Sequence, residues 1–283
     1  MNPYDSQPTP SQHLKQLKAR FRFRFKPRLS QNFLLDPRAL DGIAEAAGGA
    51  PGKCVVEVGA GGGFLTERLL RTGARVVAVE IDRELIPLLR SVVGFAPRLR
   101  IVNADILDTD LKGILREEGV ETCSVAGNLP YHVTAPVIFH LLGFRRHFDR
   151  IVVTVQKEVA ARMAAKPGTK EYGALSVAIE YSAECERLFE ISPNSFAPRP
   201  EVRSTVVRLV PRTPALEGAA ELRLFSLVKS AFGQRRKMLV NSVAETSGGK
   251  ENAISLLKAA GLDPARRGET LSLDEFIRLA KAQ

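Results

Sequence analysis

The chain has 283 residues, 45% of them hydrophobic, which is enough for one large α/β core and a small second domain. No uncharged apolar run approaches the length of a membrane-spanning helix, and the N-terminus lacks the apolar stretch of a secretory signal. We therefore expect a soluble, cytoplasmic protein with no membrane partner. Nothing in the sequence indicates a stable oligomer, so the expected state is a monomer.

The cysteine and histidine patterns disfavour disulfide and metal chemistry. Cys54, Cys123 and Cys185 are widely spaced and form no C-x-x-C pair. The four histidines lack the helical two-ligand spacing of a zinc site. We expect buried thiols and no bound metal.

The net charge of +10 lies at the two ends of the chain. Residues 1–28 contain seven basic and one acidic residue, residues 212–283 contain twelve basic and eight acidic residues, and the middle is neutral. Basic ends around a neutral core suit a protein whose ends bind a polyanion while the core performs chemistry. A solubility tail and solvated helix faces are the simpler interpretation, and charge alone does not decide between the two.

Strand and helix patterns alternate from about residue 38 onward. Strands are expected at 54–58, 75–80, 99–103, 124–127 and 151–155, with helices at 38–47, 64–71, 83–93, 110–118 and 134–142. A helix at 172–182 then precedes strands 187–191 and 203–210, which form a closing antiparallel pair. Near-continuous apolar strands predict a Rossmann-like α/β fold, with seven mostly parallel strands, an antiparallel end and helices on both faces.

A domain boundary is predicted at Pro211-Arg212-Thr213-Pro214, because proline stops both strands and helices. Beyond it the pattern is helical, with an apolar stripe from Leu222 to Phe232 and further helices at 251–260 and 273–282, the last capped by Ser272. We divide the chain into a basic N-terminal tail (1–28), an α/β domain (29–211) and a helical C-terminal domain (212–283).

A glycine cluster, Gly59-Ala60-Gly61-Gly62-Gly63, follows the first α/β strand and opens a helix. Bare backbone amides at a helix N-terminus suit the close approach of a nucleoside-type cofactor. The dinucleotide fingerprint requires glycine where this chain has Phe64, which disfavours a hydride-transfer cofactor. Glu80 ends the second strand, where a carboxylate accepts hydrogen bonds from ribose hydroxyls; Asp105 follows the third, where one accepts from an adenine amino group. A surface carboxylate and a helix cap are the simpler interpretations.

The segment Asn128-Leu129-Pro130-Tyr131 ends the fourth strand, at the edge where open α/β sheets bind ligands. An exocyclic base amine is a poor nucleophile, because its lone pair is delocalised into the ring. The Asn128 oxygen and the Leu129 carbonyl supply two acceptors for its hydrogens. Pro130 stiffens the segment and Tyr131 offers a ring for stacking, so the segment suits methyl transfer to such an amine, where alignment matters more than a strong base. A plain strand-to-helix turn is the alternative.

Seven motifs occur in one order along residues 28–283: Gln31-Asn32-Phe33-Leu34, 57–66, Val79-Glu80-Ile81-Asp82, Asn103-Ala104-Asp105-Ile106, Asn128-Leu129-Pro130-Tyr131, 155–159 and Phe196-Ala197-Pro198-Arg199-Pro200. With them the chain resembles the 16S rRNA adenine dimethyltransferases of the KsgA/RsmA type, a family that includes mitochondrial relatives and the Erm methylases. The chain departs from the family pattern at Asn103, where glycine is frequent, and after Gly59, where the usual proline is missing.

The resemblance implies a class I S-adenosylmethionine-dependent methyltransferase fold. It places the cofactor at Asn32, Leu34, Gly59, Gly61, Glu80, Asp105 and Asn128. It also pairs Phe196 with Tyr131 around an adenine that is flipped out of its stack, since a stacked base cannot present its amine to a buried sulfonium.

Two basic segments are candidates for RNA contact. Residues 232–237 place Arg235, Arg236 and Lys237 after an amphipathic helix, where they can hold backbone phosphates. Residues 20–25 alternate cation and ring, with Arg22 and Arg24 among the cations. A solvated charge run is the alternative for the first segment. A mitochondrial targeting segment is the alternative for the second, which Asp5 and the two-residue alternation disfavour.

The resulting hypothesis is methyl transfer from S-adenosylmethionine to N6 of adenosines near the 3′ end of 16S rRNA in the small (30S) ribosomal subunit, with two adjacent adenosines dimethylated and no DNA bound. The alternatives are an Erm-type 23S rRNA methylase, a catalytically idle ribosome assembly factor on the same fold and, more distantly, an NAD-binding protein. Intact Asn32, Gly59, Glu80, Asp105 and Asn128 argue against lost catalysis.

Overall fold

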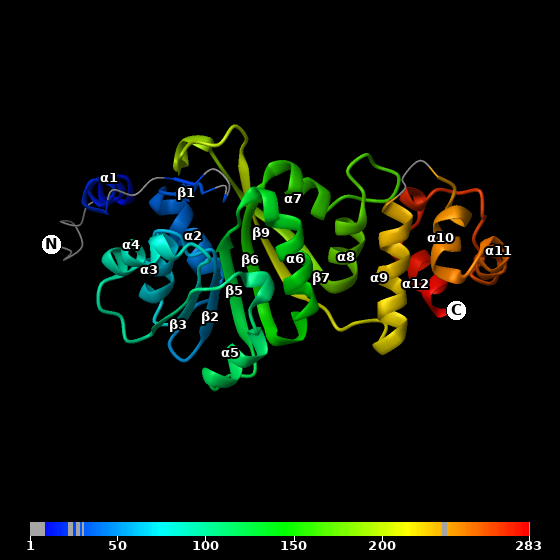
Figure 1. Ribbon diagram of the computed structural model, residues 1–283, viewed down its shortest axis with the longest axis horizontal. Helices are drawn as coiled ribbons and strands as arrows, with labels where there is room; N and C mark the ends of the chain where they lie inside the picture. Colours follow the sequence, from blue (N-terminus) through cyan, green and yellow to red (C-terminus); the bar gives the residue numbers. More distant parts are fainter. Residues whose placement is uncertain (1–8, 22–24, 27–28, 30, 234–236, 283) are drawn as a thin grey trace. The chain divides into compact units, whose positions relative to one another are not determined.

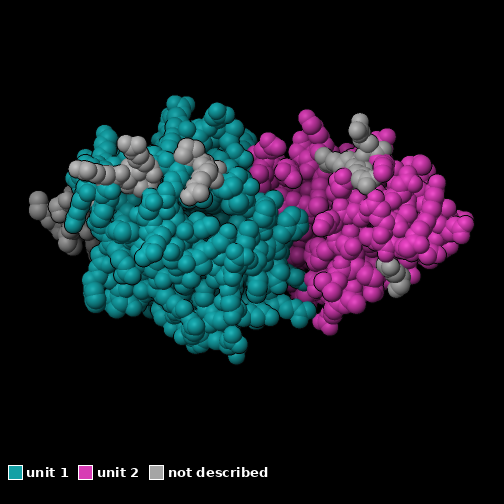
Figure 2. All heavy atoms as spheres, viewed as in Figure 1, with its two compact units in different colours: residues 1–157, 186–211 teal, residues 158–185, 212–283 magenta. Residues whose placement is uncertain are grey.

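The computed structural model describes residues 9–21, 25–26, 29, 31–233 and 237–282. The chain forms two compact units, one from residues 1–157 and 186–211 and the other from residues 158–185 and 212–283 (Figure 2). No helix in these described ranges is long and apolar enough to cross a membrane.

A seven-stranded sheet dominates the first unit, in the order β4-β3-β2-β5-β6-β9-β7 (Figure 1). Its strands are β2 (Cys54–Val58), β3 (Arg75–Val79), β4 (Leu99–Val102), β5 (Cys123–Asn128), β6 (Phe148–Gln156), β7 (Ala183–Ile191) and β9 (Ser204–Pro211). Neighbours from β4 to β6 pair in parallel, whereas β9 runs antiparallel to β6. The predicted Rossmann-like, mostly parallel sheet with an antiparallel end is therefore confirmed.

Buried side chains cover both faces of this sheet. The first unit carries helices α1 (Pro10–Phe21), α2 (Pro37–Ala46), α3 (Phe64–Arg71), α4 (Ile86–Val93), α5 (Leu111–Glu117) and α6 (Thr134–Gly143). Leu40 and Leu69 of α2 and α3 pack with Val55 in one core cluster. The alternate strand residues Val56 and Val77 are equally buried, so the opposite face is covered too. Each such side chain contributes about 1.5–3 kcal/mol of hydrophobic stabilisation.

Part of the basic tail is helical, which the sequence pattern did not indicate. Leu14 of α1 is buried in the first unit's core, and the His13 ring lies edge-on to the Phe64 ring with centroids 6.4 Å apart, so both residues attach this basic helix to the core. Arg20 and Phe21 end the helix, and Phe25 packs edge-on against Phe33 with ring centroids 5.4 Å apart. Residues 22–24 lie outside the described ranges.

The second unit is largely helical and has its own core. Its helices are α7 (Lys157–Met163), whose first residue belongs to the first unit, α8 (Ala174–Ser182), α9 (Gly218–Gly233), α10 (Leu239–Ser247), α11 (Lys250–Ala259) and α12 (Leu273–Lys281). The predicted cap of the last helix is confirmed, because the Ser272 hydroxyl accepts from the Glu275 amide and the Glu275 carboxylate accepts from the Ser272 amide. Helices α7 and α10 were not predicted.

Residues 158–185 pack with the C-terminal helices, although the sequence interpretation placed them within 29–211. Tyr172 and Tyr181 are buried in the second unit's core. Their hydroxyls donate to the carbonyl oxygens of Leu271 at 2.8 Å and Leu216 at 3.2 Å. Burial of two large amphipathic rings with satisfied hydroxyls explains why this segment joins the helical unit.

We predict that Gly127→Ala destabilises the first unit. An added Cβ would lie 2.7 Å from the backbone oxygen of Val58 on the neighbouring central strand, and backbone cannot yield cheaply. Thermal unfolding should show a loss of about 1–3 kcal/mol. Gly143→Ala, where a Cβ meets nothing within 4 Å, is the matched control and should be neutral or stabilising. Equal melting temperatures for Gly127→Ala and the wild type would contradict the prediction.

Candidate cofactor and adenine site

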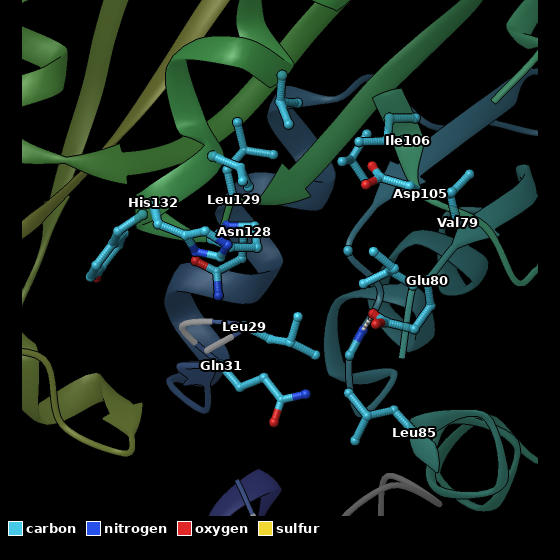
Figure 3. A pocket seen from close by; sticks show the side chains of 18 of the residues that line it. Leu29, Gln31, Val79, Glu80, Leu85, Asp105, Ile106, Asn128, Leu129 and His132 are labelled. Atoms are coloured by element: carbon cyan, nitrogen blue, oxygen red, sulfur yellow. Dashed lines mark hydrogen bonds between the residues drawn. The ribbon is translucent and has the colours of Figure 1, made fainter. Parts of the chain in front are cut away.

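A cavity lies at the carboxyl ends of the central strands β2, β3 and β5, the edge where open α/β sheets bind ligands. Of the residues predicted to bind the cofactor or the base, it is lined by Asn32, Gly59, Gly61, Glu80, Asp105, Asn128, Leu129, Pro130 and Tyr131. Figure 3 shows Glu80 and Asp105 on one side and Asn128 and Leu129 on the other. Segments far apart in the sequence thus meet at one hollow, but Leu34 and Phe196 do not line it.

The glycine loop after β2 needs glycine for its backbone geometry. Gly59 and Gly61 have φ values of 71° and 56°, in the left-handed region that other residues rarely adopt. At Gly61 an added Cβ would also lie 3.2 Å from the Phe33 ring. The Gly59 amide donates to the Val79 carbonyl at 2.9 Å, which fixes the loop to the end of β3. The result is a bare backbone surface that a ligand can approach closely.

Glu80 is a buried carboxylate held by two backbone amides. One oxygen accepts from the Gly61 amide and the other from the Asp82 amide, each at 2.7 Å. Burial raises the pKa of Glu80, and these two hydrogen bonds oppose the rise. Because each carboxylate oxygen retains further acceptor capacity, the fixed side chain can still accept from ribose hydroxyls.

Asn103, the departure from the family pattern, supports the same strand end. Its side-chain nitrogen donates to the Glu80 carbonyl at 2.8 Å and to the Ile81 carbonyl at 3.3 Å. A glycine at this position would leave these carbonyls without that donor. The Asp105 carboxylate caps a short turn by accepting from the Leu107 amide at 2.9 Å, as the simpler interpretation predicts, and Asp105 also lines the cavity.

Asn128 presents an unpaired acceptor beside the cavity. Its side-chain nitrogen donates to the Asn32 carbonyl at 2.7 Å, which fixes the orientation of the amide. Its Oδ1 is buried and has no hydrogen-bond partner among the described residues. An unsatisfied buried acceptor costs about 1–3 kcal/mol, so the site is arranged for a donor that a ligand would bring. The Leu129 amide donates to the Thr154 carbonyl at 3.2 Å and anchors the segment to β6.

The two aromatic residues predicted to enclose the base have different environments. Tyr131 lines the cavity, its hydroxyl lies 2.9 Å from the Ser204 hydroxyl, and burial raises its pKa. Phe196 is only 5% exposed and belongs to the core cluster. A small sheet explains its burial, because β8 (Phe196–Ala197) pairs antiparallel with β1 (Phe33–Leu34). Leu34 belongs to the same core cluster and, with Gly59, Gly61 and Asn128, lines a second, smaller pocket. Neither Leu34 nor Phe196 lines the main cavity.

Of the five basic residues predicted to contact RNA, the structure describes one. Lys237 is exposed. Arg22, Arg24, Arg235 and Arg236 lie outside the described residues. Within the described ranges, no group of three or more His, Cys, Asp or Glu side chains could hold a metal ion. Cys54 and Cys123 are buried and Cys185 is half-buried, and none of the three forms a disulfide within the described residues.

Four features together define a class I methyltransferase. They are a parallel sheet with one inserted antiparallel strand, a glycine loop after β2, an acid at the end of β3 and an Asn-Leu-Pro-Tyr segment at the end of β5. The residues present fit S-adenosylmethionine, because the bare glycine cradle, the fixed Glu80 carboxylate and the unpaired Asn128 oxygen match a nucleoside and an amine donor.

Comparison with known proteins specifies the family. A model of the family described as ribosomal RNA adenine dimethylase matches residues 22–282. The chain is 40% identical over 270 residues to the ribosomal RNA small subunit methyltransferase A of Alkaliphilus oremlandii, covering 94% of both chains. It is 44% identical over 262 residues to that of Geobacter metallireducens, covering 92% of this chain and 95% of the relative.

Solved structures with a similar fold are known. A dimethyladenosine transferase from Plasmodium falciparum superposes with a TM-score of 0.70 at 24% identity, over 86% of this chain and 94% of that one. The 23S rRNA methyltransferase ErmE superposes with a TM-score of 0.64 at 27% identity, over 88% of this chain and 98% of that one. The chain belongs to the ribosomal RNA adenine dimethylase family and is an rRNA adenine methyltransferase.

Sequence reasoning gave no role to several residues that shape this site. Asp82 lies within the motif Val79-Glu80-Ile81-Asp82, but its partners Lys26 and Gln31 are distant in sequence and no sequence pattern links them to it. Glu57, at the start of the glycine motif, is fully buried and its carboxyl lies 2.5 Å from the Thr66 hydroxyl. Burial raises the pKa of Glu57 to about 8, against which the Thr66 hydrogen bond acts.

Glu57 should make stability depend on pH. Its ordinary pKa of 4.5 rises to about 8 on folding, so the folded state binds an extra proton between these values. The stability associated with this proton is complete below about pH 4.5 and is lost as the pH rises through about 8. Glu57→Gln carries no such proton. We expect the melting temperature of the wild type, measured relative to Glu57→Gln, to fall from pH 5 to pH 8.5; parallel curves would refute the assignment.

Proposed function

We propose that this protein transfers methyl groups from S-adenosylmethionine to N6 of two adjacent adenosines near the 3′ end of 16S rRNA, dimethylating both. The observation that carries the proposal is the buried, unpaired Oδ1 of Asn128 beside the cavity at the carboxyl ends of the central strands of a methyltransferase sheet. The relatives at 40–44% identity are named ribosomal RNA small subunit methyltransferase A, which supports the small-subunit substrate over a large-subunit one.

The residues of this chain orient the base amine. Asn128 keeps its nitrogen on the Asn32 carbonyl, so its oxygen remains available to accept from one N–H of the adenine amino group. The Leu129 carbonyl is the second acceptor in the proposal. Two acceptors that hold both hydrogens direct the nitrogen lone pair toward the methyl group, and the positive charge that develops on nitrogen strengthens both hydrogen bonds. The proton leaves to water or to an acceptor after transfer.

The cofactor side of the cavity completes the alignment. S-adenosylmethionine supplies a methyl group that its sulfonium already activates. Glu80 accepts from the ribose hydroxyls and Asp105 from the adenine amino group of the cofactor. Gly59 and Gly61 have no side chains, so the cofactor can approach the backbone of the glycine loop closely. Asn32 and Leu34 complete the proposed contacts; because the Leu34 side chain is in the core, its contribution would come from its main chain.

Stacking of the flipped adenine is assigned to Tyr131, whose ring borders the cavity. Stacking on an aromatic side chain is worth about 1–3 kcal/mol per base and offsets part of the cost of unstacking. The role of Phe196 on the opposite side of the base requires that its ring become exposed when RNA binds, since it is buried in the core here.

The proposed partner is 16S rRNA within the assembled 30S subunit, bound by a monomer in the cytoplasm. The basic charge at both ends of the chain supports a polyanionic partner. Lys237 with Arg235 and Arg236, and Arg22 with Arg24, are the proposed phosphate contacts.

The decisive experiment supplies labelled S-adenosylmethionine together with undermethylated small subunits or with large-subunit RNA, and maps modified adenosines by mass spectrometry. Dimethyladenosine near the 3′ end of the small-subunit RNA is the expected product. Label confined to large-subunit RNA would assign the protein to the Erm type. Cofactor binding without any label would make it an assembly factor.

We predict that Asn128→Ala lowers kcat by about 10²–10³, the usual effect of removing one preorganised hydrogen-bonding group. The reason is loss of the acceptor that orients the amine, and single-turnover transfer to undermethylated small subunits measures it. Asn252→Ala, which removes an exposed asparagine of the helical unit, is the matched control and should retain wild-type kcat. Wild-type turnover by Asn128→Ala would refute the alignment mechanism.

A further inference from the structure

Asp82 is a buried carboxylate with no place in the mechanism above, and three groups of the chain donate hydrogen bonds to it. Its side chain is 3% exposed. One oxygen accepts from the Lys26 ammonium at 2.8 Å and from the Glu84 amide at 3.1 Å, and the other accepts from the Gln31 side chain at 2.7 Å. A carboxylate on the surface at a strand end can be hydrated by water, so it would not require three donors from the protein.

These contacts connect two walls of the cavity. Lys26 and Gln31 are also joined to each other, since the Lys26 amide donates to the Gln31 side-chain oxygen at 2.8 Å. Gln31 lines the cavity and immediately precedes Asn32, whose carbonyl holds Asn128. On the other side, the Asp82 amide donates to Glu80. A continuous chain of hydrogen bonds therefore runs from Lys26 through Asp82 to Glu80.

The charges around Asp82 show why the cation is needed. Glu80, Asp82 and Glu84 lie on one short stretch, and Lys26 also contacts the Glu84 carboxylate at 2.9 Å. Burial raises the pKa of Asp82, but the hydrogen bonds from Lys26 and Gln31 outweigh it and hold the pKa below its ordinary value. Asp82 therefore remains ionised, and Lys26 offsets the repulsion that the stretch would otherwise have.

We propose that Asp82 is a positioning residue for the cofactor, which acts by fixing Glu80 through its amide and Gln31 and Lys26 through its carboxylate. The proposal rests on the proposed use of S-adenosylmethionine. Asp82 itself need not touch the cofactor. Its carboxylate determines whether the ribose-binding acid and the residue next to Asn32 are in place before the cofactor arrives, so that binding does not have to order them.

The test is the affinity of the full chain for S-adenosylmethionine, measured by calorimetry without RNA. Asp82→Asn keeps the backbone amide but loses the ion pair, and we expect the Kd to rise about tenfold, as for loss of hydrogen bonds to a charged group. The kcat at saturating cofactor should stay within about twofold of wild type, because the Asn128 segment is unchanged. If Asp82 had only a structural role, Asp82→Asn would lower the melting temperature but would not raise the Kd while leaving kcat unchanged.

Lys26 variants keep the inference testable if Asp82→Asn folds poorly, since the Lys26 side chain is 23% exposed. Lys26→Met should raise the Kd for S-adenosylmethionine, whereas Lys26→Arg, which keeps the positive charge, should have the wild-type Kd. The double variant Lys26→Met/Asp82→Asn should bind no more weakly than Asp82→Asn alone, because both act through one ion pair. Lys157→Met, which breaks an exposed 2.8 Å pair with Glu190 in the same unit, is the matched control and should leave the Kd unchanged.

A second readout needs no cofactor. In the free protein, hydrogen exchange of the Gly61 and Asp82 amides, both bonded to Glu80, should be faster in Asp82→Asn and Lys26→Met than in the wild type. Wild-type exchange and wild-type Kd in both variants would overturn the inference. Failure of the wild type itself to bind S-adenosylmethionine would instead overturn the proposed function, so the two failures are distinguishable.

Discussion

The adjacency of β2 and β5 at the centre of the sheet is the constraint on which the site depends. These strands are distant in sequence, yet their parallel pairing brings the glycine loop and the Asn128 segment to one edge. Gly127 makes this possible, because only hydrogen fits against the Val58 backbone at that point. Ligand binding at such a topological switch point is a property of the fold, and the particular side chains at the two strand ends give it methyl-transfer chemistry.

Most of the sheet and its helices could be predicted from the sequence, because their signals are local. The apolar run Cys54–Val58 and the stripe of α3 each carry their own periodicity, and the structure places both where the pattern did. Glu80 could likewise be predicted from the sequence, since its spacing from the glycines is a property of one βαβ unit. A known family resemblance supplied the remaining cofactor positions.

The features that escaped prediction depend on partners distant in sequence. Helix α1 contacts the core through Leu14 and through His13, whose ring lies against Phe64, and no window of the helix's own sequence reveals these partners. Residues 158–185 join the helical unit through Tyr172 and Tyr181, whose acceptors lie far along the chain. The Lys26 and Asp82 pair is of the same kind. Periodicity reports which face of an element is apolar but not which element covers it.

The pairing of β1 with β8 has a consequence for the order in which the protein becomes competent during synthesis. Phe33 and Leu34 leave the ribosome early, but their partners Ala197 and Phe196 are among the last residues of the first unit to be made. The strand that carries one cavity wall therefore has no partner until nearly all of that unit has been translated. A nascent methyltransferase can form its central parallel strands first, and it acquires the anchored wall beside Asn32 only when the antiparallel pair of β1 and β8 closes.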